Sequence, residues 1–311
     1  MVAGDVGGGT TRSNDLQAFR MRCMVNISDL PREKRPRHTV AEGVAATVQM
    51  PSAATGLTQM GVHVRSVEPG FAGTNRHFHS VEEEWTYVLA GRGAVRIGPL
   101  RMPVRAGHFV GFPPGPRPHH FIAQGDATLV LLEGGERRPA EDSVWYPDVR
   151  RMLRARAAVD PYEEPPPEEG DERQVVHVED VDVKTFQHDL DPAVRWRMRA
   201  LHRVAGLQRQ AVYWEQVEAG GRSTVLHTHD RTDEWVLVLS GRGIARTGDE
   251  RFAIGPNDFL GYPAGGPPHS MEAMDELTYL VGGQIDASDM VTYPEAGLRR
   301  VGGQLQPLSS H

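Results

Sequence analysis

The chain has one cysteine, Cys23, only two lysines among its 34 basic residues, and no long apolar run. A single cysteine cannot form an internal disulfide, which excludes a small secreted fold held together by disulfides. No 18-residue apolar stretch is available to cross a membrane, and residues 1–20 lack the apolar centre of a signal peptide. We therefore expect a soluble, cytoplasmic protein that does not act at a membrane.

The chain also lacks clustered positive charge: no basic stripe with interleaved aromatic residues occurs, and the net charge is −7. This excludes the usual electrostatic footprint of a nucleic-acid-binding protein. The acidic residues are concentrated instead. Residues 160–173 (DPYEEPPPEEGDER) hold seven of them together with four prolines, a composition that predicts an extended, solvated linker.

An internal repeat dominates what is present. A pattern of two histidines, a glutamate and a later histidine occurs twice at a constant offset of 150 residues: His77, His79, Glu84 and His119, then His227, His229, Glu234 and His269. The same offset carries Trp85 onto Trp235 and Gly111 onto Gly261. Register kept over about 40 residues indicates an internal duplication, which determines the architecture before any local prediction is made.

The spacing within each copy predicts local structure. Residues i and i+2 of a strand face the same side, so His77 and His79 point together. Glu84 lies at the wrong parity for the same strand, so the residues between must form a turn, and Glu84 begins a second strand. The adjoining Glu82 and Glu83 are interpreted as solvated turn residues. His119 follows a proline-rich loop and should reach the site from a third strand.

These are the two sequence motifs of the cupin superfamily, and the chain resembles a bicupin. The first motif spans 70–91 (GFAGTNRHFHSVEEEWTYVLAG) and 220–241; the second spans 107–119 (GHFVGFPPGPRPH) and 257–269 (NDFLGYPAGGPPH). Two departures occur in the second motif: one extra residue before the histidine in both copies, and Asn257 where glycine is usual. Asparagine tolerates the left-handed conformation that such a turn requires.

The resemblance implies an all-β fold of two tandem cupin barrels, that is, double-stranded β-helices of the jelly-roll type. We expect five segments in chain order: a disordered extension at 1–24, which is either native or a product of start-site choice, barrel 1 at 25–148, a short helix and acidic proline-rich linker at 149–174, barrel 2 at 175–298, and a tail at 299–311. The helix is predicted at 149–159 from its apolar spacing. Similar lead-in strands are predicted at 25–31 and 175–183.

Three neutral imidazoles and one carboxylate leave two adjacent positions open on an octahedral metal. This donor set suits one divalent transition metal per barrel. Fe(II) is favoured, and Mn(II), Ni(II), Co(II), and Cu(II) or Zn(II) in lower coordination, remain open because ligand type does not choose among them. Open positions admit a substrate chelate, water or dioxygen, which allows Lewis-acid activation or oxygen chemistry.

Strand parity suggests which side chains share the interior with the ligands. In copy one these are Asn75, Thr86, Val88 and Phe121, and in copy two Val225, Val236, Val238 and Met271. The first cavity is therefore predicted to be more polar, although core packing alone explains the apolar residues.

On the strands that enter the motif, His63 and Arg65 of copy one become Tyr213 and Glu215 in copy two. These four, with Asn75 and Thr86, are acid–base or anchoring candidates, unless they face outward. His120 should point away from the metal. Arg96 and Arg246 either bind a carboxylate or lie on the exterior.

The leading hypothesis is a metal-dependent, dioxygenase-type oxidoreductase acting on a small chelating enol, catechol or diketone. The first alternative is a non-redox isomerase, lyase or decarboxylase; the second is a metal-containing protein that binds a small molecule without turnover. Among bicupins, oxalate decarboxylases have an arginine three residues before the first ligand histidine, where Thr74 and Thr224 stand here. Two fused barrels imitate a cupin dimer, so a monomer is acceptable and a homodimer compatible.

Overall fold

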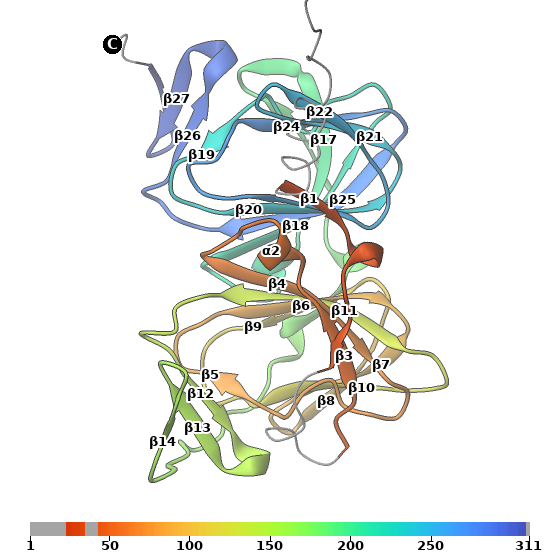
Figure 1. Cartoon of the computed structure of the whole chain (residues 1–311), viewed down its shortest axis with the longest axis vertical. Coiled ribbons are helices and arrows are strands. Elements are labelled where there is room, and N and C mark those ends of the chain that lie inside the picture. The colour runs from red at the N-terminus through yellow and green to blue at the C-terminus, as the bar shows by residue number, and fades with distance from the viewer. Residues whose placement is uncertain (1–22, 35–42, 309–311) are drawn as a thin grey trace, which may run out of the picture.

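The computed structural model describes residues 23–34 and 43–308 and contains two β-barrels stacked end to end along the long axis of the molecule (Figure 1). Almost all of the regular structure is β. The two α-helices of the described chain, α2 (Pro51–Ala54) and α3 (Leu201–Val204), are one turn each. The predicted all-β architecture of two tandem barrels is confirmed. The predicted extension at 1–24 lies, except for its last two residues, outside the described residues.

Barrel 1 is built from a seven-stranded sheet in the order β15-β9-β6-β11-β4-β3-β2 and a three-stranded sheet in the order β10-β7-β8. The apolar side chains between them form one core, which includes Val88, Val95, Phe121 and Leu131. The strands are β2 (Glu33–Lys34), β3 (Ala46–Gln49), β4 (Met60–Val67), β6 (Glu84–Ala90), β7 (Arg92–Ile97), β8 (Leu100–Arg105), β9 (His108–Phe112), β10 (His119–Ala123), β11 (Leu129–Glu136) and β15 (Val175–His177).

Barrel 2 repeats this plan with the sheets β1-β23-β20-β25-β18-β17-β16 and β22-β21-β24. Its core includes Met24, Val236, Val238 and Met271. The strands are β1 (Met24–Asn26), β16 (Lys184–His188), β17 (Asp191–Ala200), β18 (Gln210–Val217), β20 (Glu234–Ser240), β21 (Gly243–Thr247), β22 (Glu250–Ile254), β23 (Asp258–Tyr262), β24 (His269–Ala273) and β25 (Leu277–Gln284). Asn257, just before β23, has φ of 69°, the left-handed conformation predicted for it.

The lead-in strands are exchanged between the barrels, which departs from the predicted division at residues 25 and 175. Strand β1 precedes barrel 1 in sequence but pairs with β23 of barrel 2, and β15 precedes barrel 2 but pairs with β9 of barrel 1. Each segment therefore completes the sheet of the other copy. A strand at a sheet edge presents unpaired backbone groups to any compatible segment. Each lead-in strand therefore supplies backbone hydrogen bonds to a strand of the other copy, β1 to β23 and β15 to β9.

The predicted helix at 149–159 is wrong, because this segment forms a β-hairpin, and a second β-hairpin at 298–307 occupies most of the predicted tail. Strands β13 (Arg151–Arg154) and β14 (Ala157–Val159) extend a sheet that runs β14-β13-β12-β5, through β12 (Ser143–Tyr146) to β5 (Phe78–His79). Pairing with β12 buries Met152, so tertiary packing outweighs the helix propensity of this segment. Strands β27 (Leu298–Val301) and β28 (Gln304–Pro307) repeat the arrangement beside β19 (Thr228–His229) and β26 (Met290–Tyr293).

Short turns connect these elements. They include five 3-10 segments: η1 (Ile27–Asp29), η3 (Pro147–Val149), η4 (Glu172–Gln174), η5 (Val178–Asp180) and η6 (Pro294–Ala296). The acidic segment 161–171 has neither helix nor strand and is largely exposed, as expected of a linker. It is tied to barrel 1 where Glu168 N donates to Pro116 O. Within the described residues, no helix has the length and apolar character needed to cross a membrane.

The two large sheets pack against each other and form the interface between the barrels. Alternation along β6 places Trp85 and Tyr87 on this outer face, with Glu84 and Thr86 on the inner face. Trp85 stacks on Trp235 of barrel 2, with ring centroids 5.0 Å apart and an interplanar angle of 15°. Strands β6 and β20, which begin with the predicted ligands Glu84 and Glu234, are therefore also interface strands.

Candidate metal centres

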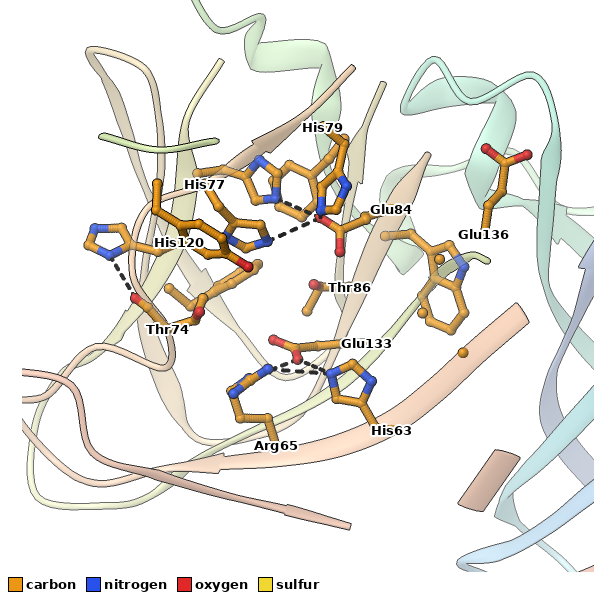
Figure 2. Close-up of a pocket in the computed structure, with 18 residues that line it drawn as sticks. His63, Arg65, Thr74, His77, His79, Glu84, Thr86, His120, Glu133 and Glu136 are labelled. Atoms are coloured by element: carbon orange, nitrogen blue, oxygen red, sulfur yellow. Dashed lines mark hydrogen bonds and ion pairs between the residues drawn. The ribbon is translucent and has the colours of Figure 1, made fainter. Parts of the chain in front are cut away.

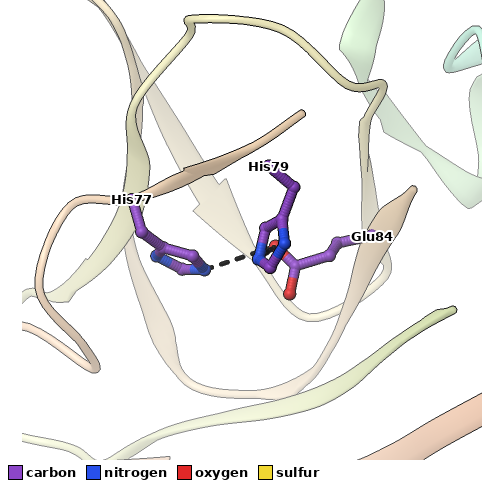
Figure 3. A group of neighbouring side chains, drawn as sticks. All are labelled: His77, His79 and Glu84. Atoms are coloured by element: carbon purple, nitrogen blue, oxygen red, sulfur yellow. Dashed lines mark ion pairs between the residues drawn. The ribbon is translucent and has the colours of Figure 1, made fainter. Parts of the chain in front are cut away.

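In barrel 1 the four predicted ligands converge. His77 precedes β5, His79 ends it, Glu84 begins β6 and His119 begins β10. The Nε2 atoms of His77, His79 and His119 lie 3.3, 3.5 and 3.1 Å from Oε2 of Glu84. Figure 3 shows His77 and His79 directed at the Glu84 carboxylate. The turn at 80–83 resets the face as the spacing predicted, so residues of opposite parity meet at one point.

Barrel 2 brings its four predicted ligands together in the same way. The Nε2 atoms of His227 and His229 lie 3.7 and 3.2 Å from Oε2 of Glu234, and that of His269 lies 3.3 Å from Oε1. The two sites thus have the same donors on the same elements, in line with the duplication.

The outer nitrogens of the barrel 1 imidazoles are also held. Nδ1 of His79 lies 2.6 Å from the Asp142 carboxylate, and Nδ1 of His77 and of His119 lie near the carbonyl oxygens of Asn75 and Arg117 at 3.0 and 3.3 Å. These acceptors place the proton on Nδ1 and leave each Nε2 lone pair directed inward, which is how a metal-binding imidazole is oriented. The residues therefore fit a divalent metal ion. In barrel 2, Asp289 makes the same 2.6 Å contact with His229.

The carboxylates beside His79 and His229 favour positive charge on these two rings. Burial opposes protonation of His79, but the carboxylates of Glu84 and Asp142 outweigh it and raise the pKa of His79 to about 9. Burial also opposes protonation of His229, but the carboxylates of Asp289 and Glu234 outweigh this effect and raise the pKa of His229 to about 10. Anionic groups gathered in a buried place stabilise a cation there, and a metal ion supplies that charge.

Sequence reasoning missed Asp142 and Asp289, although a signal was present. Each aspartate lies four residues before the tyrosine of the duplicated exit strand, at Tyr146 and Tyr293. The pairing of β12 with β5 and of β26 with β19 brings them beside the ligand histidines. Extending the repeat through the exit strand would therefore have identified both residues.

In barrel 1 a group of charged side chains extends across the face of the sheet beyond the predicted ligands. A cavity of about 230 Å³ reaches from the histidines to His63, Arg65 and Glu133 (Figure 2). Thr86, Glu133 and His63 are direct cross-strand neighbours on β6, β11 and β4, so they form one polar row. The structure thus places the predicted His63, Arg65 and Thr86 on the cavity, together with Glu133, which was not predicted.

Glu133 is the centre of this row. Its Oε2 atom lies 2.7 Å from Nε2 of His63 and 2.8 Å from Nε of Arg65. Arg65 is almost fully buried and also donates to the carbonyl of Gly73. Although burial opposes ionisation, the charge of Arg65 and the hydrogen bond from His63 lower the pKa of Glu133 to about 2. Glu133 is thus a fixed carboxylate.

The equivalent row of barrel 2 is largely apolar. Val236 and Val281 replace Thr86 and Glu133, and Tyr213 replaces His63. Glu215, at the position of Arg65, accepts a 2.8 Å hydrogen bond from the hydroxyl of Tyr279. The prediction that the first cavity is the more polar agrees with this arrangement.

The remaining candidates differ in position. Asn75 is buried but does not line the cavity, whereas Phe121 lines the cavity and also belongs to the core of barrel 1. Val88, Val238 and Met271 belong to the cores. Val225 supplies the carbonyl near Nδ1 of His227. His120 borders the cavity, with Nδ1 3.4 Å from the carbonyl of Thr74. Arg96 donates to a backbone carbonyl and Arg246 forms an ion pair with Glu295, so both lie on the exterior of their barrels.

The interpretation of Glu82 and Glu83 as solvated turn residues is wrong. Glu82 accepts a hydrogen bond from the backbone of Arg138, and its carboxylate lies 3.7 Å from Nδ1 of His79. Glu83 is 2 % exposed. The parity that directs Glu84 inward directs Glu83 into the interface between the barrels, which the sequence of one copy could not reveal.

Comparison with known proteins gives matches to a family and to solved structures. The cupin domain family matches residues 63–134 and 213–282. Oxalate decarboxylase from Lactobacillus farciminis, solved as a formate complex, is 15% identical over 84% of this chain and 86% of its own, with a TM-score of 0.56. The Bacillus subtilis oxalate decarboxylase at pH 4.6 is 16% identical over 84% and 75%, with a TM-score of 0.54.

A putative sugar phosphate isomerase from Acidithiobacillus ferrooxidans is 30% identical over 42% of this chain and 85% of its own, with a TM-score of 0.40. No curated protein matches the sequence. The family matches fall on the two copies of the repeat, and the similarity to the decarboxylases extends over both barrels. The chain belongs to the cupin superfamily and is a bicupin, with one cupin domain in each half.

Proposed function

We propose that the chain is a metal-dependent, non-redox lyase or isomerase whose reaction takes place in barrel 1. The substrate is a small molecule that chelates the metal through carboxylate or carbonyl oxygens. This is the alternative, rather than the dioxygenase, of the two enzyme hypotheses raised by the sequence. The solved bicupins with the same fold are described as oxalate decarboxylases, and one is described as having Mn(II) centres, so Mn(II) takes precedence over Fe(II) as the first metal to test.

The observation that carries the proposal is the chain of contacts from Arg65 through Glu133 to His63, on the cavity wall opposite the metal ligands. Removal of carbon dioxide, or migration of a double bond, leaves a carbanion or enolate that must receive a proton. A histidine oriented by a fixed carboxylate is a common device for such transfer. Ring-cleaving oxygenation does not by itself call for a proton donor at this point.

Each residue has a separate role. Arg65 is buried and fixes the Glu133 carboxylate, which stays ionised and so does not deliver the proton. Glu133 accepts from Nε2 of His63 and orients the ring. His63 is more exposed than Glu133 and carries the proton to and from the substrate. The metal, when bound by His77, His79, Glu84 and His119, supplies Lewis-acid stabilisation of negative charge on the substrate oxygens. Thr86 provides a hydroxyl between the predicted ligand Glu84 and the carboxylate of Glu133.

The proposal does not assign oxalate as substrate, because Thr74 lines the cavity where the oxalate decarboxylases have an arginine. The test is a panel of 2-oxo, 2-hydroxy and dicarboxylic acids, with oxalate included, incubated anaerobically with the Mn(II)-loaded protein and followed by NMR. We expect turnover without dioxygen, reduced roughly 100-fold or more in His63→Gln. Tyr213→Phe, at the equivalent position of barrel 2, should retain full activity.

Turnover that begins only when dioxygen is admitted, with dioxygen consumed in proportion to product, would restore the dioxygenase hypothesis. Saturable binding of a panel member without product would indicate a binding protein instead.

A further inference from the structure

Glu83 of barrel 1 reaches across the interface and binds the backbone of barrel 2. Its carboxylate accepts hydrogen bonds from N–H of Gln208 at 3.0 and 3.2 Å, of Arg209 at 2.8 Å and of Gln210 at 3.0 Å. The residue is 2 % exposed. A buried carboxylate that accepts three backbone N–H bonds is held rigidly, because any displacement leaves both the charge and the donors unpaired.

Asp233 makes the reciprocal contact from barrel 2 to barrel 1. Its Oδ2 atom accepts N–H of Thr58 and of Gln59, both at 2.8 Å, and Oδ1 accepts N–H of Ala264 at 3.0 Å. Asp233 is 1 % exposed. The two carboxylates therefore bind the segments that lead into β18 and β4, each in the barrel opposite to its own.

The backbone N–H of each residue is fixed as well. Glu83 N donates to the Glu136 carboxylate at 2.8 Å, and Glu136 is in turn bound by Arg209 of the other barrel. Asp233 N donates to Oε1 of Gln284 at 2.8 Å. Main chain and side chain are thus both anchored at the residue that immediately precedes a metal-ligand glutamate.

We propose that Glu83 and Asp233 are cross-barrel positioning residues for the metal ligands Glu84 and Glu234. Successive residues of a strand point to opposite faces. Anchoring the outer residue to the partner barrel fixes the Cα position and direction of the next residue, whose carboxylate faces the metal. Each metal site is therefore completed only when the other barrel is in place. The inference rests on the proposed metal sites but not on the proposed reaction.

The test is metal binding rather than activity. His229→Ala removes a ligand of barrel 2 and isolates barrel 1 for Mn(II) titration. In that background Glu83→Gln should weaken Mn(II) binding roughly tenfold, the lower end of the loss that follows when a group that orients a metal ligand is changed. Glu83→Asp should recover much of the affinity, because Asp233 makes the equivalent cross-barrel contacts to Thr58 and Gln59 with an aspartate. Asp233→Asn in a His79→Ala background should weaken the barrel 2 site in the same way.

The cross-barrel element is tested by Arg209→Ala, a change in barrel 2 that is read in barrel 1. It should weaken Mn(II) binding by barrel 1 several-fold, and it keeps the proposal testable if Glu83→Gln does not fold. If Glu83→Gln and Arg209→Ala lower the thermal midpoint while the Kd of barrel 1 stays within twofold, the residues only hold the interface together and the proposal is overturned. If His229→Ala protein with Glu83 intact binds no metal, the proposed ligand set has failed instead.

Discussion

The Oδ2 atom of Asp142 lies 2.6 Å from Nδ1 of His79, on the side of the ring away from the converging ligands. This contact fixes the tautomer and increases the basicity of the inward nitrogen. We predict that Asp142→Asn weakens metal binding by barrel 1 roughly 10-fold to 100-fold. Titration of the purified protein with Mn(II) in the His229→Ala background measures this. Asp289→Asn is the matched control, since it should affect barrel 2 alone.

Metal stoichiometry tests the two ligand sets directly. Protein purified anaerobically without added metal should contain close to two metal ions per chain by elemental analysis. His79→Ala and His229→Ala should each lose one. If both substitutions leave the metal content unchanged, the assigned histidines are not ligands.

Removal of the metal should also lower stability, because an ion that binds only the folded state stabilises it by about 2.7 kcal/mol at a free concentration of 100 times its Kd. We expect chelation to lower the thermal midpoint of the wild type and to lower that of the His79→Ala, His229→Ala double variant much less. Equal shifts in both proteins would mean that the chelator acts elsewhere.

The motifs of the two copies were sufficient to predict the fold and to place the eight predicted ligands in two groups. They succeeded because the ligands recur at fixed spacing, so each copy checks the other. Glu133 could not be found in this way, because its counterpart is Val281 and the repeat gives no signal there. Its role depends on lying opposite both Thr86 and His63 across two strand pairs, which only the sheet register determines.

The exchange of lead-in strands was beyond sequence reasoning for a related reason. The segments at 24–26 and 175–177 are similar, and either could complete either sheet, so local pattern cannot tell which barrel each joins. The hairpin at 298–307 was more accessible. Gly302 and Gly303, with φ of 54° and 81°, form the type of two-residue turn that glycine pairs favour.

The stacked pair of Trp85 and Trp235 predicts how strongly the barrels depend on each other. Both rings are almost fully buried at the centre of the interface cluster. Trp85→Ala should lower the free energy of unfolding by roughly 3–5 kcal/mol. In a double-mutant cycle measured by chemical denaturation, Trp85→Ala and Trp235→Ala should cost less together than the sum of the two single changes. Additive costs would show that the rings do not contribute through each other.

The last prediction concerns Glu215 in barrel 2. Burial raises its pKa to about 8, against the hydrogen bond from Tyr279 and with help from the charge of Glu234. In the unfolded chain a glutamate has a pKa of about 4.3. Between these two values the unfolded chain releases the proton while the folded chain keeps it. Stability contributed by this group is therefore complete below the lower value and is lost as the pH rises towards about 8.

Glu215→Gln keeps the size of the side chain and cannot ionise, so it lacks this loss. We expect the variant to gain stability relative to wild type as the pH rises from about 5 to 8, by a total on the order of 3 kcal/mol. Denaturant unfolding of both proteins, stripped of metal by chelation, measures the difference at each pH. The exposed Glu218→Gln serves as the control and should follow the wild-type curve. Parallel curves for wild type and Glu215→Gln would mean that Glu215 is ionised in the folded protein throughout this range, and that barrel 2 stabilises two carboxylates at once.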